Sequence, residues 1–129
     1  MSFEIPGRKI TRVAAADLSG KQYRMVKLDN TAKVAAFAAD TDRPYGILQD
    51  KPTAGMEAEI MKNGVSKLYA GAGGIVMGDP VIPDADGKGT VGAFGADVTK
   101  FVIGVALETV AAGGLFAVDF DCGAAPRGA

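Results

Sequence analysis

The sequence predicts an all-β fold, a compact single-domain barrel or sandwich of about ten short strands with little helix. Turn-forming residues separate short apolar or alternating runs roughly every 8 to 12 residues, and the 18 glycines are spread along all 129 residues. Nearly every apolar run meets a Gly or Pro before it reaches the roughly ten residues of an amphipathic helix. A chain of this length buries roughly two-thirds of its unfolded surface, so we expect one hydrophobic core.

The predicted strands alternate with turn signals along the chain. They cover residues 23–29, 33–38, 44–49, 57–62, 65–70, 75–77, 80–83, 90–94, 101–108 and 115–121. Asn63-Gly64 is the best hairpin signal, because a type I′ turn needs positive φ at both central residues. Residues 97–112 also fit one apolar helix face, which makes this segment the most ambiguous.

An internal repeat favours a strand in the ambiguous segment. Residues 34–40 match residues 91–97 in the pattern Val-x-Ala-Phe-x-Ala-Asp, 57 positions later. The match continues at Gly46-Ile47 and Gly104-Val105 after one insertion. If the two halves share a fold, the short strand at Gly46 predicts a strand at Gly104 as well.

The repeat predicts two β-modules, residues 22–62 and 79–121, joined by the segment between them and packed around one core. Phe37 and Phe94 should occupy equivalent core positions, where each ring fills space left by small neighbours. Chance similarity between two Ala- and Gly-rich segments is the alternative.

Composition argues against several classes of function. The chain has no His and one cysteine, Cys122, so it lacks the commonest general base and metal ligand and cannot form a disulfide within the monomer. Fourteen Lys and Arg against fifteen Asp and Glu leave a formal charge of -1, which gives no overall field for nucleic acid or an anionic membrane. No apolar run reaches the roughly 18 residues of a membrane span, and residues 1–11 lack the apolar stretch of a signal peptide.

Charge is nevertheless uneven along the chain. Residues 1–30 carry six basic and three acidic side chains, and the remainder carries eight basic and twelve acidic ones. We expect a basic and an acidic pole that orient the protein on a partner surface. A solvated face without a partner is the alternative.

Patterns that suggest ligand or metal binding are incomplete. Gly71-x-Gly73 lacks the third glycine of a dinucleotide site, and no Gly-Lys-Ser/Thr follows to form a phosphate-binding loop. Asp79, Asp84 and Asp86 lack the later acidic ligand of a calcium loop. We expect neither cofactor nor metal.

Candidate catalytic residues are equally unconvincing. Ser66 and Lys67 are adjacent on a predicted strand and therefore point to opposite faces. Glu57 and Glu59 share one strand face, which we expect to be an exposed acidic surface. Cys122 has no His to activate it. We therefore expect no catalytic residue.

The first twelve residues predict an extended arm that precedes a β-domain at residues 13–121 and a tail at residues 122–129. Apolar and basic residues alternate there, and Pro6-Gly7 prevents a continuous helix. An extended segment can add a strand to a neighbouring sheet edge. The residues expected to contact a neighbouring subunit or another protein are Phe3, Ile5, Pro6, Arg8, Lys9, Ile10 and Arg12. Deleting residues 2–10 should then leave the fold and its melting temperature nearly unchanged but weaken binding to the partner; a frayed tail is the alternative.

Several segments resemble a family of small phage proteins. Residues 16–23 (Ala-Asp-Leu-Ser-Gly-Lys-Gln-Tyr) and 26–29 (Val-Lys-Leu-Asp) resemble the opening of the phage capsid decoration, or head cement, protein family, formerly a domain-of-unknown-function family. Segments 45–52, 64–67, 78–81, 84–88 and 103–108 are similar to that family in the same order. The resemblance covers about residues 13–120.

The resemblance implies a compact β-tulip-like fold and a homotrimer on the outer surface of the phage head, over threefold sites between capsomers of the major capsid protein. It implies a virion protein made in the bacterial host cytoplasm. Its partners would be itself and the major capsid protein, with no nucleic acid, membrane, small-molecule substrate or cofactor. A trimer that bridges capsomers stabilises the head against the pressure of packaged DNA, because many contacts must break together.

Two other classes of function stay open. Another virion part, such as a head-to-tail adaptor or a fibre base, follows the same structural logic. A small β-barrel enzyme or ligand-binding protein would need convergent polar groups, which a chain with no His, no Trp and three Ser supplies poorly.

Overall fold

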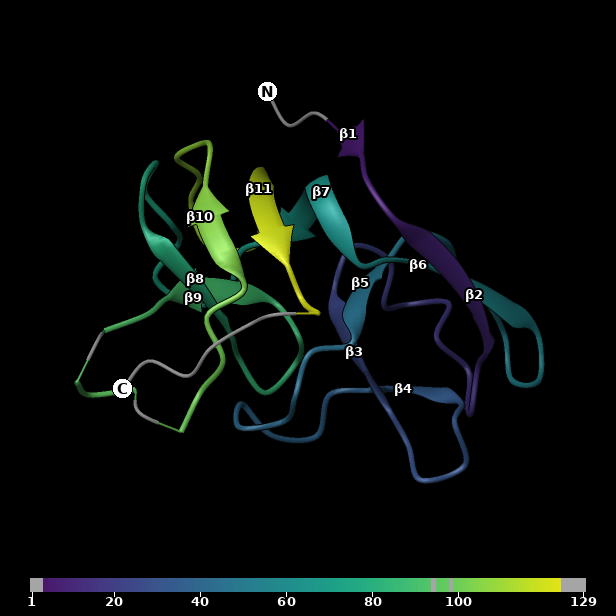
Figure 1. Cartoon of the computed structure of the whole chain (residues 1–129). Coiled ribbons are helices and arrows are strands. Elements are labelled where there is room, and N and C mark those ends of the chain that lie inside the picture. Colours follow the sequence, from purple (N-terminus) through teal and green to yellow (C-terminus); the bar gives the residue numbers. More distant parts are fainter. Residues whose placement is uncertain (1–3, 94, 98, 124–129) are drawn as a thin grey trace.

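The computed structural model describes residues 4–93, 95–97 and 99–123, and these residues form eleven strands and no helix (Figure 1). The strands are β1 (Ile5–Pro6), β2 (Lys9–Val13), β3 (Met25–Leu28), β4 (Val34–Ala36), β5 (Gly46–Leu48), β6 (Glu57–Met61), β7 (Asn63–Tyr69), β8 (Pro80–Pro83), β9 (Gly89–Val91), β10 (Gly104–Ala106) and β11 (Leu115–Asp121). They form two antiparallel sheets. The predicted all-β fold is confirmed, and the ambiguous segment at 97–112 contains the strand β10.

The two sheets have the same connectivity. One sheet has the strand order β2-β6-β5-β3-β4, and the other has the order β7-β11-β10-β8-β9 with β1 added at its edge. Replacing each strand of the first sheet by the strand five later gives the second sheet. The chain therefore consists of a first repeat (β2–β6) and a second repeat (β7–β11), which lie side by side in Figure 1. This confirms the predicted internal repeat, but its bounds of 22–62 and 79–121 are too narrow, since β2 and β7 begin the two repeats.

The junction of the repeats differs from the prediction. Lys62 alone separates β6 in one sheet from β7 in the other. Asn63-Gly64 lies in β7, so the predicted hairpin turn is wrong. Gly64 has a φ of +113°, and a side chain there would come within 2.7 Å of the carbonyl oxygen of Ile5. This glycine serves the close approach of β1 to β7, which sequence alone could not reveal. The strand predicted at residues 75–77 does not form, and Ile75 makes only an isolated bridge to Val110 there.

Backbone pairing fixes how the repeats align. Val26 lies opposite Ala36 and Gly46, and Val81 lies opposite Val91 and Gly104 in the same way. The offset is therefore 55 residues through β3 and β4, and 58 residues from β5 onward, because the second repeat has a longer loop before β10.

This register corrects part of the predicted alignment. Ala36 corresponds to Val91, so Phe37 corresponds to Gly92 and the 57-residue match was out of register by two. Phe37 is buried, as expected, at 7% exposure. Phe94 lies outside the described residues. The counterpart of Phe37 in this register is a glycine, because small residues around both phenylalanines produce a sequence match that the strand pairing does not follow.

Backbone geometry that the two repeats share supports the corrected alignment. Tyr23 (φ 59°) and Ala32 (φ 64°) are the non-glycine residues with positive φ in the described part of the chain. Both correspond to glycines of the second repeat, Gly78 (φ 91°) and Gly87 (φ 78°). The amide of Tyr23 donates to the carbonyl of Leu48 at 2.8 Å, and Gly78 donates to Ala106 at 2.8 Å.

The main core lies between the two sheets. Met25, Ile47 and Met61 cover one face of the first-repeat sheet and meet Phe116 and Val118 of the second repeat. The other face of the first-repeat sheet has its own buried cluster: Ala14, Leu18, Val26, Val34, Leu48, Ala58 and Ile60. The first-repeat sheet is thus covered on both faces.

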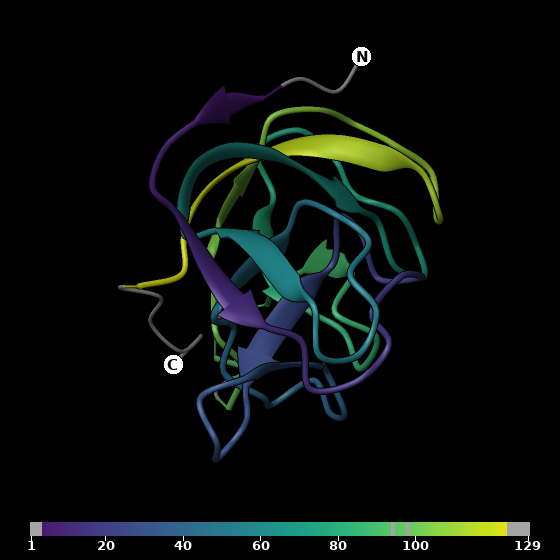
Figure 2. The ribbon, with the colours of Figure 1, turned by 90° about the vertical axis from the view of Figure 1, so that its right-hand side faces the viewer.

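The predicted N-terminal arm belongs to the sheets. Ile5 pairs with Val65 of β7, and β2 pairs with β6 along its whole length (Figure 2). The segment is extended, as predicted, but its strand partners lie in the same chain. The boundary at residue 12 is therefore wrong, since β2 is the first strand of the first repeat.

Candidate interaction surfaces

A row of residues crosses the outer face of the second-repeat sheet. Cross-strand pairing aligns Ile5, Val65, Asp119, Val105 and Pro80 on one face. Ile5 is 59% exposed and Val105 is 45% exposed. We call these five residues the outer row.

The same positions are covered in the first repeat. Met61, Ile47 and Met25 correspond to Asp119, Val105 and Pro80, and all three are buried at 1% exposure or less. The second-repeat sheet covers them in the main core. The outer row is therefore the counterpart of a surface that is buried in the first repeat; Ile5 and Val105 are exposed in it, whereas Val65 is buried.

A hydrogen-bonded loop adds two apolar side chains near this face. Val76 and Met77 are 57% and 65% exposed. The amide of Val76 donates to Asp79 Oδ2 at 3.0 Å, and the amide of Met77 donates to Thr109 Oγ1 at 2.9 Å. The backbone N–H of the next residue, Gly78, donates to the carbonyl of Ala106, which ends β10 and follows Val105. We call the exposed apolar side chains Ile5, Val105, Val76 and Met77 the apolar face.

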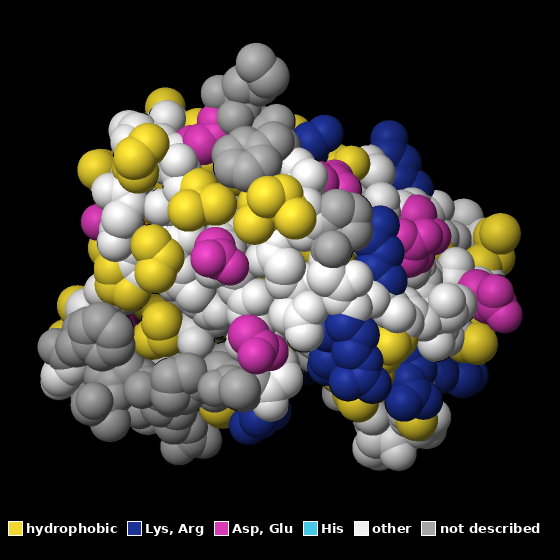
Figure 3. Space-filling model, turned by 45° about the horizontal axis from the view of Figure 1, so that its top comes forward, with side chains coloured by type: hydrophobic (Ala, Val, Ile, Leu, Met, Phe, Trp, Pro, Cys, Tyr) yellow, Lys and Arg dark blue, Asp and Glu magenta, His cyan; other side chains and the backbone are white. Residues whose placement is uncertain are grey.

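Charge separates between the repeats. Residues 4–62 carry ten Lys and Arg against eight Asp and Glu, and residues 63–123 carry three against seven. Figure 3 shows hydrophobic side chains gathered on the left, over the second repeat, and Lys and Arg gathered on the right, over the first. The uneven charge expected from the sequence thus coincides with the two repeats.

The predicted contact residues do not form one surface. Ile5 belongs to the apolar face, whereas Arg8, Lys9 and Arg12 are exposed on the first repeat. Ile10 packs against the core of the first repeat. Phe3 lies outside the described residues, and the side chain of Pro6 is not described.

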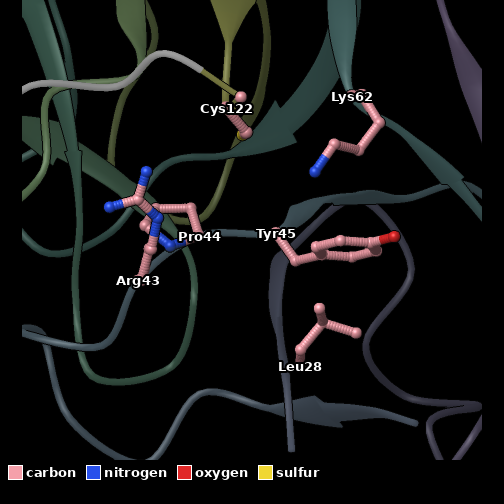
Figure 4. A pocket seen from close by; sticks show the side chains of 7 residues that line it. Leu28, Arg43, Pro44, Tyr45, Lys62 and Cys122 are labelled. Atoms are coloured by element: carbon pink, nitrogen blue, oxygen red, sulfur yellow. The ribbon is translucent and has the colours of Figure 1, made fainter. Parts of the chain in front are cut away.

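A pocket of about 260 Å³ opens where the two repeats meet (Figure 4). Its lining residues are Leu28, Arg43, Pro44, Tyr45, Lys62, Cys122 and Gly123. Lys62 Nζ lies 3.7 Å from the centroid of the Tyr45 ring. Burial raises the pKa of Cys122 to about 12, so this thiol is protonated at neutral pH. Sequence reasoning missed this pocket.

The weak catalytic and metal candidates have structural roles. Ser66 is buried, accepts a hydrogen bond from Gln49 Nε2 at 3.0 Å and donates to the carbonyl of Lys67. Asp84 accepts the amides of Asp86 and Lys88 in its own turn. Among the described residues, no group of three His, Cys, Asp or Glu is placed to hold a metal ion.

Two equivalent aspartates brace the loops after β4 and β9. Asp42 Oδ2 accepts the amides of Ala38 and Ala39, and Asp97 Oδ2 accepts the amide of Ala93 at 2.8 Å. The Ala93 amide, and then Lys100, hold the pKa of Asp97 below its ordinary value. Burial opposes this effect at Asp42, but its hydrogen bonds together still lower the pKa.

Lys100 connects the two loops. Its Nζ lies 3.1 Å from Asp97 Oδ1 and 3.3 Å from Asp40 Oδ2 in the other repeat. The hydrogen bonds to Asp97 and then to Asp40 raise the pKa of Lys100. The repeats therefore share an ion pair as well as a core.

The described part of the chain contains no helix long and apolar enough to cross a membrane. No family model matches the sequence, and no curated protein does. Among solved structures, the chain is similar to the N base of the head fiber gp8.5 of bacteriophage phi29. The TM-score is 0.67 at 18% identity, over 89% of this chain and 94% of that chain. This likeness establishes a shared fold.

Proposed function

We propose that this chain is a structural protein of a phage virion, which binds the outer surface of the head as a homotrimer and stabilises contacts between capsomers of the major capsid protein. The observation that carries the virion class is the fold likeness to a phi29 head fiber base over 89% of the chain, and the decorating role rests on the sequence resemblance. The ordered sequence resemblance to capsid decoration proteins supports the same class independently.

The surface properties support an adhesive role. The apolar face exposes Ile5, Met77 and Val105 by 59%, 65% and 45%, and covering that exposed part at an interface contributes about 1–1.5 kcal/mol each. The edge strands β4 and β9 end their sheets. A closed trimer covers such edges, which otherwise invite irregular association. Contacts repeated in many copies stabilise the particle together.

Binding to undecorated phage heads tests this function. We expect the purified wild-type protein to co-sediment with heads and Met77→Asp to bind at least tenfold more weakly, because the change places a charge in a buried contact. Met56→Asp is the matched control, since Met56 is 57% exposed but lies in a turn of the first repeat. Failure of the wild-type protein to bind any head surface contradicts the proposal.

A base for a head fibre is a second candidate, and the phi29 likeness favours it. In that role, one surface of the chain binds the head and another carries a fibre. Electron microscopy of particles distinguishes the two candidates. A compact knob at each site indicates decoration, and a rod extending from the knob indicates a fibre base.

A further inference from the structure

The pocket at the junction of the repeats combines positive charge with aromatic walls. Figure 4 shows the ammonium group of Lys62 above the Tyr45 ring, with Leu28 on the other side of that ring. Arg43 enters from the neighbouring loop, with its guanidinium carbon 5.1 Å from the centroid of the Phe101 ring.

The second repeat shows that the fold does not require these polar residues. The backbone N–H of Tyr45 donates to the carbonyl of Val26, and the N–H of Ile103 donates to the carbonyl of Val81 in the same way. Because Val26 corresponds to Val81, Tyr45 corresponds to Ile103. By the same register, Arg43 corresponds to Phe101 and Lys62 corresponds to Phe120. The three counterparts are 3–7% exposed and belong to the main core. The first repeat has cations and a phenol where its duplicate has an apolar core.

The two cations are electrically unbalanced. Within the described residues, no carboxylate lies within ion-pair distance of Arg43 or Lys62, whereas Lys9 and Lys27 each have one and Lys100 has two. Aromatic rings hold both cations in place, and a ring attracts a cation without neutralising it. Arg43 and Lys62 therefore line the pocket as two cations without a carboxylate partner among the described residues.

The pocket chemistry favours a carboxylate on an apolar stem. Leu28 and Pro44 provide an apolar wall for methylene groups, while Lys62 and Arg43 provide donors for a carboxylate. A volume of about 260 Å³ accommodates a few side-chain atoms. A nucleic acid needs a longer basic track than two cations supply, and the chain as a whole has a charge of -1.

We propose that the pocket formed by Arg43, Tyr45 and Lys62 binds a glutamate or aspartate side chain from an acidic segment of a protein partner. The assignment of that partner to the phage head rests on the function proposed above. The pocket then fixes the register of docking, since a charge-assisted contact has defined geometry, while the apolar face supplies burial.

Titration with a hexaglutamate peptide, followed by backbone amide NMR, tests the pocket directly. We expect the shifts to centre on residues 43–45 and 62. Arg43→Met with Lys62→Met keeps the aliphatic stems and should weaken binding at least tenfold. Lys33→Met with Lys51→Met removes two exposed cations elsewhere on the first repeat and should leave binding unchanged. A melting curve establishes that each variant is folded.

A second variant tests the pocket by shape. Lys62→Phe introduces the residue of the second repeat and should abolish the peptide shifts by filling the space. Absence of shifts with hexaglutamate, or equal binding by the methionine variants, overturns the proposal. Tighter binding of inorganic phosphate or of a six-nucleotide oligothymidylate at the same residues overturns it as well.

The same variants on undecorated heads separate the two proposals. If the wild-type protein binds heads and the Arg43→Met, Lys62→Met variant binds equally well, the pocket proposal is wrong and the proposed function stands. If the wild-type protein does not bind heads but binds hexaglutamate at the pocket, the proposed function is wrong and the acidic-segment site stands.

Discussion

The guanidinium carbon of Arg43 lies 5.1 Å from the ring centroid of Phe101, which is the counterpart of Arg43 in the second repeat. Two equivalent loops thus meet at equivalent residues, one polar and one buried. The two repeats differ in structure at this contact. In the second repeat this position completes the core, and in the first it borders an open pocket.

This contact predicts unequal costs of truncation. Phe101→Ala should lower the free energy of unfolding by about 3–5 kcal/mol, because the ring is 7% exposed within the main core. Arg43→Ala should lower it by about 1 kcal/mol or less, since an exposed cation–π contact is weak. Urea unfolding measures both. Equal losses would show that Arg43 has a structural role similar to that of Phe101.

The two positive-φ positions predict a stabilising substitution. Ala32→Gly should raise the free energy of unfolding by about 0.5–1 kcal/mol, because the left-handed conformation strains any L side chain. Gly87→Ala at the equivalent position should destabilise the protein by a larger amount, since a Cβ there collides with the Met25 carbonyl oxygen. Thermal melting of both variants checks the pair, and a lower melting temperature for Ala32→Gly contradicts the alignment argument.

The braced loop predicts a pH dependence. The pKa of Asp97 is lower in the folded protein than in the unfolded chain, so its contribution to stability is present above the unfolded pKa. That contribution is lost as pH falls through the lower, folded pKa, in the acid range below about 4. Asp97→Asn should flatten this part of the stability profile, with Asp86→Asn as the control. Parallel profiles for the wild-type protein and Asp97→Asn would refute this role.

The N-terminal strands predict a stability loss on truncation. Deleting residues 2–13 removes β1, β2 and the packing of Ile10, so the melting temperature should fall sharply or the chain should fail to fold. Far-ultraviolet circular dichroism measures this. An unchanged melting temperature in the truncated protein would contradict this expectation and support an independent arm. Deleting residues 2–4 alone, which precede β1, is the control and should have little effect.

Sequence patterns predicted what depends on local chemistry. The alternation around Met25–Leu28 and the acidic turn at Asp84 correctly predicted a strand and a hairpin, because side-chain periodicity and turn propensity are local. The repeat was visible at Gly46 and Gly104, where both backbones approach a neighbouring strand too closely for a side chain.

The errors arose where tertiary pairing decides the outcome. Asn63-Gly64 suits a tight turn, but the glycine instead admits β1 beside β7. The N-terminal segment suits any open sheet edge, and only the folded chain shows that the edges of its own sheets accept it. Arg43 and Lys62 are distant in sequence, and their role emerges only by comparison with Phe101 and Phe120.

Counting this chain in purified phage particles tests the central claim most directly. Quantitative mass spectrometry against the major capsid protein gives the number of copies per particle. A decorating trimer predicts a fixed ratio on the order of hundreds of copies, because the stabilisation depends on contacts repeated over the whole head. About a dozen copies or fewer would place the protein at a neck or tail, and its absence from particles would contradict a virion role altogether.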